Sequence, residues 1–471
     1  MSAAAAHVEA SGPPATPGDL MTGRERLRLV LVLGALIAIG PLTIDMYLPA
    51  LPAITADFDT AEAAVQLTLT GTLAGLAVGQ LMIGPLSDAV GRRVPLLAGL
   101  VLHVIASALC VVAPNIGTLG VLRVLQGLGT AAASVVAMAV VRDLFSGTAF
   151  ARIFSRLMLV MGAAPVLAPT LGSAVLGWTD WRGVFIALAV IGIVLVVLAA
   201  FRLPETLPVH RRRSGGVHGT VRVYRSLLRD RTFVGLVGVA GLAMAALFAY
   251  VSGSSFVFQE EYGLDERQFG IVFGAGAVGL IGASQLNVRL LRRYTPQRIL
   301  TTALTVGTLA GLVLLAVAAT GFGGLPAVLA SLWVVLAASG LAMPNAPALA
   351  LSRHGEAAGT AAALLGAVQF GIGALLAPLV GVLGNGSVGM GLVIAGGMAA
   401  ALAVLVLVVR PARLPAVPAS EAVSVSEAIP ASEAVPASEA VPASEAVSVA
   451  EVAAASDVGP AARTSVRAMS E

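Results

Sequence analysis

Long apolar runs separated by short polar segments dominate residues 28–409. A helix needs about 18 to 20 mostly apolar residues to cross a bilayer, and twelve runs of that length can be counted. We predict transmembrane helices at residues 28–51, 63–85, 93–112, 117–141, 154–177, 183–201, 232–257, 268–290, 298–319, 324–348, 357–382 and 387–409. The pattern therefore predicts an all-α membrane protein.

Composition supports this fold class and excludes several functions. Hydrophobic residues make up 58% of the chain and charged residues 11%, against about 25% charged residues in soluble domains. All 28 basic residues are arginine, which excludes the lysine-dependent phosphate loop of an ATPase. The single cysteine, Cys110, allows no internal disulfide. Neither a nucleophile with its base nor a metal-ligand cluster is visible, so we expect no enzyme and no cofactor.

The placement of the arginines predicts the orientation in the membrane. Arg24, Arg26 and Arg28 precede the first span, and acidic residues follow it. Positive charge is retained on the cytoplasmic side, and twelve spans return the chain to the side on which it began. Only Arg182 and Arg267 fall in loops expected on the other side. We therefore expect a multi-pass protein of the cell inner (plasma) membrane with both termini cytoplasmic.

Breaks in composition divide the chain into five parts. The longest internal connection contains HRRR and separates six spans from six, so contact with anionic lipid headgroups is more plausible for it than nucleic-acid binding. After the last span the unit PASEAV recurs, which predicts a disordered acidic tail. The parts are a disordered cytoplasmic lead (1–27), a six-helix bundle (28–201), a cytoplasmic linker (202–231), a second six-helix bundle (232–410) and the tail (411–471).

Two charges lie in the interior of the predicted spans, well away from the span ends, and each is a functional candidate. Asp45 lies in GPLTIDMYLPALPAI on span 1, and Arg123 lies on span 4. At about 1.5 Å per residue, they lie roughly 8 Å and 9 Å from the middle of their spans, on the same side. We expect them to pair, because pairing offsets the cost of each buried charge. The pair is either a static salt bridge between spans 1 and 4 or a titratable pair that couples proton movement to transport.

A second candidate cluster lies where spans 2, 3 and 4 reach the cytoplasmic side. It is either a solvated loop or a set of ion pairs that closes the cytoplasmic gate. Its residues are Gly84, Asp88, Gly91, Arg92, Arg93, Arg142 and Asp143.

Small and polar residues mark further positions. Span 5 carries a kinked face for close helix packing, formed by Gly162, Pro165, Pro169 and Gly172. In the second half, Asn345 and Gln369 either form hydrogen bonds between helices or line a cavity. His103 has no obvious partner, so we expect a structural role for it.

At these residues the sequence resembles the major facilitator superfamily. The loop signature G-x-L-a-D-r-x-G-r-r appears as Gly84 to Arg93, and the span 4 signature R-x-x-Q-G-x-G begins at Arg123. The span 5 antiporter signature is incomplete, because Ala168 and Ser173 replace glycines. The stretches TIDMYLPALP, AYVSGSSFVFQEEYG and AMPNAPALAL resemble the bicyclomycin-resistance (Bcr/CflA) branch of twelve-span drug:proton antiporters.

The resemblance implies the major facilitator fold, with two six-helix pseudo-repeats around a central cavity. It assigns Asp45 and Arg123 to proton and substrate coupling, and it suggests Tyr47, Gln126, Tyr250, Asn345 and Gln369 as cavity candidates. We expect a monomeric multidrug efflux transporter that exchanges small amphipathic, drug-like compounds for protons. The alternatives are a proton-coupled symporter or facilitator that imports a nutrient, and a membrane receptor or scaffold that recruits a partner through its acidic tail.

Overall fold

The computed structural model describes residues 18, 21–212, 216–354, 358–384 and 386–411. Every regular element in these ranges is helical, which confirms the predicted all-α fold. The predicted tail beyond Pro411 and nearly all of the predicted lead before Met21 lie outside the described residues.

Twelve helical stretches in the described part of the chain are long and apolar enough to cross a membrane, as predicted. The first six spans are formed by α1 (Gly23–Asp45) with η1 (Leu48–Ala50) and α2 (Leu51–Asp57), α3 (Glu62–Val90), α4 (Arg93–Val111), α5 (Ile116–Leu144), α6 (Gly147–Leu176) and α7 (Arg182–Arg202). The last six are formed by α9 (Arg231–Phe256) with η3 (Val257–Glu261), α10 (Glu266–Leu290), α11 (Pro296–Thr320), α12 (Gly324–Leu351), α13 (Ala358–Leu376) with α14 (Leu379–Val382), and α15 (Ser387–Val404) with η5 (Leu405–Val409).

The structure differs from the prediction at the start of the first span and within the linker, for local reasons. Helix α1 begins at Gly23, not near residue 28, because Thr22 and Glu25 form a reciprocal capping box. The predicted linker contains a short turn, η2 (Val209–Arg211), and a helix, α8 (Gly216–Leu227), before Asp230 caps α9. Apolar run length does not reveal an amphipathic helix of this kind, because its polar face interrupts the run.

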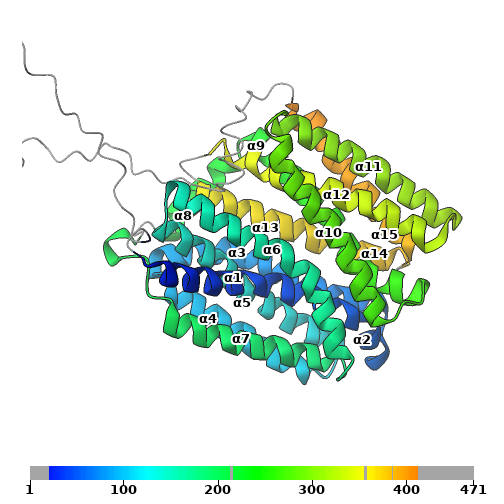
Figure 1. The fold of residues 1–471 in the computed structure, drawn as a ribbon, viewed down its shortest axis with the longest axis horizontal. Coiled ribbons are helices and arrows are strands. Elements are labelled where there is room, and N and C mark those ends of the chain that lie inside the picture. Colours follow the sequence, from blue (N-terminus) through cyan, green and yellow to red (C-terminus); the bar gives the residue numbers. More distant parts are fainter. Residues whose placement is uncertain (1–17, 19–20, 213–215, 355–357, 385, 412–471) are drawn as a thin grey trace, which may run out of the picture. The chain divides into compact units, whose positions relative to one another are not determined.

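The two halves of the chain repeat one packing pattern, as expected for two pseudo-repeats (Figure 1). In the first half, α3 packs on α5, α4 on α5 and α7, and α1 on α6. In the second half, the helices six spans later make the corresponding contacts, which are α10 on α12, α11 on α12 and α15, and α9 on α13. Both halves therefore build the same bundle.

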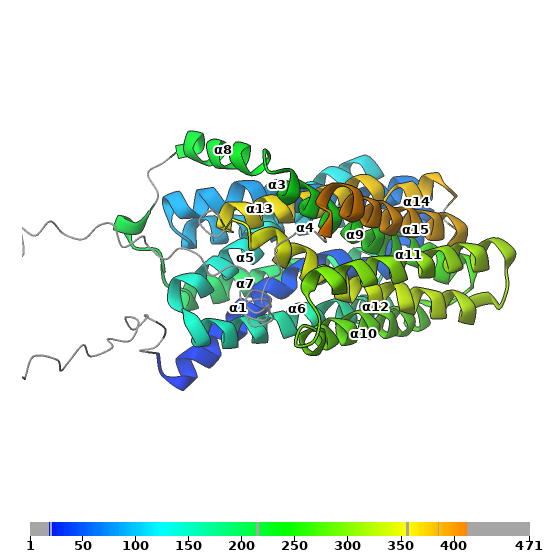
Figure 2. The same cartoon turned by 90° about the horizontal axis from the view of Figure 1, so that it is seen from above.

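The seam, by which we mean the contact surface between the two halves, is formed mainly by two helix pairs. Helix α3 packs on α13, and α6 packs on α10. Figure 1 and Figure 2 both show α13 alongside α3. Span 2 thus meets span 11 and span 5 meets span 8, which is the exchange expected when two repeats face each other across a pseudo-two-fold axis.

Glycines allow α3 and α5 to approach at backbone distance. A Cβ at Gly75 would overlap the carbonyl oxygen of Val124, and a Cβ at Gly127 would overlap that of Thr72. In contrast, a Cβ at Gly120, on the same helix as Gly127, would meet nothing within 4 Å. The first bundle therefore has a close-packed centre that tolerates no added side chain.

We predict that Gly127→Ala destabilises the protein by about 1–3 kcal/mol, the usual cost of overpacking, because α3 and α5 must move apart. Gly120→Ala is the matched control and should be neutral or slightly stabilising, since alanine favours helix more than glycine does. Thermal unfolding of the purified proteins measures both. Equal melting temperatures for the two variants would contradict the close packing.

Candidate functional site

The first span is broken next to Asp45, and its prolines explain the break. Pro49 and Pro52 have no N–H group, so the carbonyls four residues earlier, those of Asp45 and Leu48, lose their usual helical donors. Helix α1 therefore ends at Asp45, and a short 3₁₀ turn precedes α2. The second half supplies a donor, because the hydroxyl of Ser255 on α9 donates to the carbonyl of Leu48.

Asp45 lies where α1, α6 and α9 meet. Its exposed fraction is 6%, and its carboxyl group makes no hydrogen bond or ion pair with another described residue. Tyr250 on α9 lies close to this carboxyl group. On α6, Gly172 lies against the carbonyl of Met46, where a Cβ would overlap. The carboxyl group therefore lies next to the seam, enclosed but without a cation.

Arg123 on α5 is fully buried inside the first bundle. Its Nη1 donates to the carbonyl of Thr43 at 3.1 Å and to Oε1 of Gln126 at 2.5 Å. The guanidinium carbon lies 4.4 Å from the ring centroid of Tyr47 and 5.7 Å from that of Phe185. These contacts partly offset the cost of burying the charge.

One edge of the Arg123 guanidinium is unused. Nε and Nη2 have no hydrogen-bond partner among the described residues. These two groups form the side of the guanidinium that binds a carboxylate through two parallel hydrogen bonds. The buried cation thus has two parallel N–H donors that no described residue accepts.

The predicted ion pair between Asp45 and Arg123 is not formed in this structure. Arg123 instead contacts the carbonyl of Thr43, two residues before Asp45. Arg123 also lies over the ring of Tyr47, two residues after Asp45. Side chains two residues apart on a helix are rotated by about 200°, so the Asp45 side chain faces another side. Position along the spans correctly predicted that Arg123 reaches the part of α1 that contains Asp45. It carries no information about which face of α1 the Asp45 side chain occupies.

A chain of buried polar groups extends from Arg123 to α4, and sequence reasoning missed it. Nε2 of Gln126 donates to Oγ of Ser107 at 2.7 Å. Nδ1 of His103 lies 3.1 Å from Oγ1 of Thr130, which in turn donates to the carbonyl of Gln126 at 2.8 Å. The available signal was the four-residue spacing of His103 with Ser107, and of Gln126 with Thr130, on two facing apolar spans.

The other cavity candidates lie in different surroundings. Tyr47 is buried, and its hydroxyl lies 2.5 Å from that of Thr68. Tyr250 stacks on Phe273 and lines an apolar cavity of about 100 Å³ within the second half. Asn345 donates to Asn287 at 2.7 Å and so links α12 to α10. Gln369 on α13 is half-buried.

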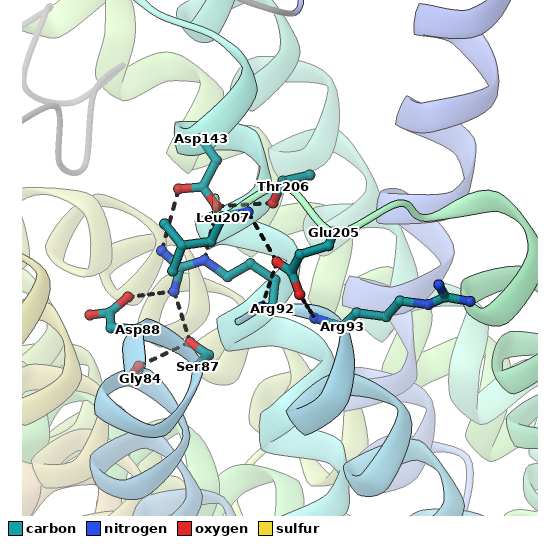
Figure 3. A network of polar contacts seen from close by, with 9 residues as sticks. All are labelled: Gly84, Ser87, Asp88, Arg92, Arg93, Asp143, Glu205, Thr206 and Leu207. Carbon is teal, nitrogen blue, oxygen red and sulfur yellow. Dashed lines mark hydrogen bonds and ion pairs between the residues drawn. The ribbon is translucent and has the colours of Figure 1, made fainter. Parts of the chain in front are cut away.

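The predicted gate cluster is centred on Arg92 (Figure 3). This side chain pairs with Asp88 and with Asp143, whose Oδ2 lies 2.9 Å from its Nε. Its Nη1 also donates to Oγ of Ser87 at 2.9 Å. The structure therefore brings the ends of α3, α4 and α5 together through a single guanidinium.

Glu205, in the linker after α7, also belongs to this cluster, and no sequence signal pointed to it. Its carboxylate accepts from the backbone N–H groups of Arg92 at 2.9 Å and Arg93 at 3.2 Å. Burial disfavours its charge, but these bonds and that from Leu207 hold the pKa of Glu205 below its usual value. Gly91 has a φ of 105°, and a Cβ there would approach the carboxylate, which explains the need for glycine.

The remaining gate residues are more peripheral. Arg93 donates to the carbonyl of Ala200 at 2.6 Å, and the carbonyl of Gly84 accepts from Ser87 at 2.9 Å. Arg142 makes no ion pair with a described residue and lies beside Gly359 at the start of α13. All ion pairs of the cluster among the described residues are therefore within the first half.

The small residues of span 5 lie on the seam as well as on α1. Pro165 and Pro169 are inside α6, and Gly162 contacts Ile281 on α10. Ser173, which follows Gly172, donates to the carbonyl of Glu266 at 2.7 Å and so crosses between the halves.

Comparison with known proteins identifies the family. The family model of the Major Facilitator Superfamily matches residues 31–378. The chain is 39% identical over 372 residues to the uncharacterized MFS-type transporter YdgK of Bacillus subtilis (strain 168), with coverage of 79% of this chain and 92% of that protein.

Two further relatives carry names that refer to drug resistance. The chain is 32% identical over 351 residues to a bicyclomycin resistance protein homolog of Haemophilus influenzae, with coverage of 74% of this chain and 88% of that protein. It is 31% identical over 288 residues to the multidrug resistance protein MdtL of Klebsiella pneumoniae (strain 342), with coverage of 61% and 72%.

Solved structures share the fold at low identity. The xylose transporter XylE of E. coli, in a partially occluded inward open conformation, superimposes with a TM-score of 0.65 at 13% identity, over 81% of this chain and 97% of that one. A bacterial homolog of the human lysosomal transporter Spinster gives 0.64 at 16% identity, over 88% and 100%. Together with the sequence matches, these likenesses show that the chain belongs to the major facilitator superfamily, in the bicyclomycin-resistance branch that its motifs indicated.

Proposed function

We propose that this transporter exports small amphipathic compounds from the cytoplasm in exchange for protons, by alternating access. The observation that carries the proposal is the arrangement of Asp45 and Arg123, a buried acid without a cation and a buried cation with an empty carboxylate-binding edge. Relatives named for bicyclomycin and multidrug resistance support the substrate class and the direction.

The two charges provide a means of coupling. A charged carboxylate without a cation is costly at membrane depth, so we propose that Asp45 carries a proton in this conformation. When the broken segment after Asp45 rotates, the acid can reach the Nε–Nη2 edge of Arg123, and the ion pair then replaces the proton. Proton release and helix movement are thereby linked.

The seam suggests which side is closed. Ser255 donates to Leu48, and Gln66 Nε2 lies 3.4 Å from the carbonyl of Ser252. These contacts between the halves lie on the face opposite the arginine-rich loops. We place the arginine-rich loops in the cytoplasm, in accordance with the positive-inside rule. The structure then corresponds to a state closed toward the outside.

The proton gradient is large enough to drive such export. One charge that crosses 100 mV yields about 2.3 kcal/mol, and each unit of pH difference adds about 1.36 kcal/mol. Flux in everted vesicles distinguishes export from the alternative of nutrient import. Acidification of the vesicle lumen should drive drug accumulation in the lumen, and drug efflux from the lumen under the same gradient would favour the importer.

Deletion of residues 411–471 tests the scaffold alternative. A transporter should retain its drug flux, whereas a scaffold that acts through the tail should lose its function.

We predict that Asp45→Asn reduces proton-driven export at least about tenfold, equivalent to about 1.4 kcal/mol, because the amide cannot exchange a proton. The variant should fold, since the substitution is nearly isosteric and Asp45 makes no ion pair. Drug susceptibility in a host without its own pumps, with and without a protonophore, measures the effect. Asp59→Asn is the control, because Asp59 is an exposed loop acid. Wild-type coupling in Asp45→Asn would refute the assigned role.

Arg123→Lys should also reduce proton-driven export at least about tenfold, equivalent to about 1.4 kcal/mol. Lysine keeps the charge but has neither the planar two-donor edge nor the stacking on Tyr47. Transport of a fluorescent drug into everted vesicles measures the loss. A charge-only role for Arg123 would instead leave the rate of the lysine variant close to that of the wild type.

A further inference from the structure

The polar groups next to Arg123 form a hydrogen-bonded chain that limits where each proton can lie. The hydroxyl of Thr130 has one proton and donates it to the carbonyl of Gln126 at 2.8 Å. In its 3.1 Å contact with Nδ1 of His103, Thr130 can therefore only accept. In that arrangement His103 is the donor, with its proton on Nδ1. The alternative is a proton on Nε2, which faces Oγ of Ser107 at 3.5 Å, while the carbonyl of Leu188 also lies beside the ring.

The same count of donors and acceptors determines how the side-chain amide of Gln126 is oriented. Ser107 donates its proton to the carbonyl of His103 at 2.7 Å, so its oxygen can only accept from Nε2 of Gln126 at 2.7 Å. The amide oxygen of Gln126 then faces Nη1 of Arg123. A flipped amide would direct its N–H groups at the guanidinium, which is itself a donor, and its oxygen at a hydroxyl that has already donated its proton to the carbonyl of His103.

Packing holds the imidazole in the orientation that this chain requires. Gly129 on α5 lies against His103, since a Cβ there would be 2.7 Å from the backbone nitrogen and 3.0 Å from the Cβ of His103. On the other side, a Cβ at Gly192 of α7 would be 3.1 Å from Cδ2 of the ring. His103 therefore sits between α5 and α7 with little freedom to rotate.

We propose that His103 is a positioning residue for the Arg123 site. With its proton on Nδ1, His103 binds Thr130 and fixes α4 against α5, so that Ser107 orients the amide of Gln126. Gln126 then anchors Nη1 of Arg123 and leaves the Nε–Nη2 edge directed at its anion. This role replaces the structural role expected from the sequence, and it rests on the proposed function of Arg123.

The protonation state can be tested without transport. The chain has five histidines, and ¹⁵N-histidine spectra of the purified protein, compared with those of His103→Asn, identify the signal of His103. A neutral ring with its proton on Nδ1 supports the proposal. A proton on Nε2 alone would overturn it, whether or not the protein exports drugs, so this outcome is distinct from failure of the proposed function.

Matched substitutions test the positioning role. Thr130→Val is isosteric but cannot accept a hydrogen bond, and His103→Leu cannot donate one. Each substitution should lower the initial rate of transport about five- to tenfold, as expected for one buried hydrogen bond. Each should also shift the pH midpoint of transport. Thr130→Ser keeps the hydroxyl, and the side-chain nitrogen of His103→Asn takes the place of Nδ1, so both should restore most of the rate and the original midpoint. The His103→Leu/Thr130→Val double variant should be no worse than either single variant.

Two results would contradict the role. Additive losses in the double variant would show that the two residues act separately. An unchanged pH midpoint in Thr130→Val, with a lower melting temperature, would show that the chain only stabilises the fold.

Discussion

The cost of a charge at membrane depth determines how this protein is built. Arg123 is completely buried, and its charge is balanced by a carbonyl, an amide oxygen and two aromatic faces in place of an acid. Such neutral groups compensate a cation only in part. In the proposed mechanism, an arginine held in this way can bind a carboxylate without first releasing another one.

The break in the first span connects this charge to the seam. Prolines remove the usual helical donors of the carbonyls of Asp45 and Leu48, and the carbonyl of Leu48 accepts instead from the N–H of Leu51 and from Ser255 on α9. The local backbone beside Asp45 is thus maintained partly by the second half. If the halves separate at this face, as the proposed mechanism requires, the carbonyl of Leu48 keeps the N–H of Leu51 but loses Ser255. The proposed opening of the seam would therefore remove one constraint on the segment that follows Asp45.

The sequence predicted the fold well and the site only in part. Apolar run length sets the spans, so most of their ends agree with the structure to within a few residues. The exceptions are both ends of the first span, the end of α3 at Val90 and the start of α6 at Gly147. Charge at depth identified Asp45 and Arg123. It did not reveal that they face different sides, because facing depends on how α1 is rotated in the bundle. Glu205 and the contact of His103 with Thr130 were missed because their partners come from distant segments.

The packing also indicates where movement can occur. Inside the first bundle, Gly127 lies against the backbone carbonyl of Thr72, and backbone surfaces in such contact cannot slide without overlap. At the seam, a methyl group added to Gly162 would meet only the side chain of Ile281, at 3.5–3.8 Å, which is ordinary van der Waals contact. Side chains of this kind can change rotamer as helices shift. The seam therefore combines such adaptable contacts with closer ones, since a Cβ at Gly381 on α14 would lie 2.9 Å from the Cα of Ala63 on α3. In the proposed rocking of the two bundles, the close contact must separate and the adaptable ones can stay.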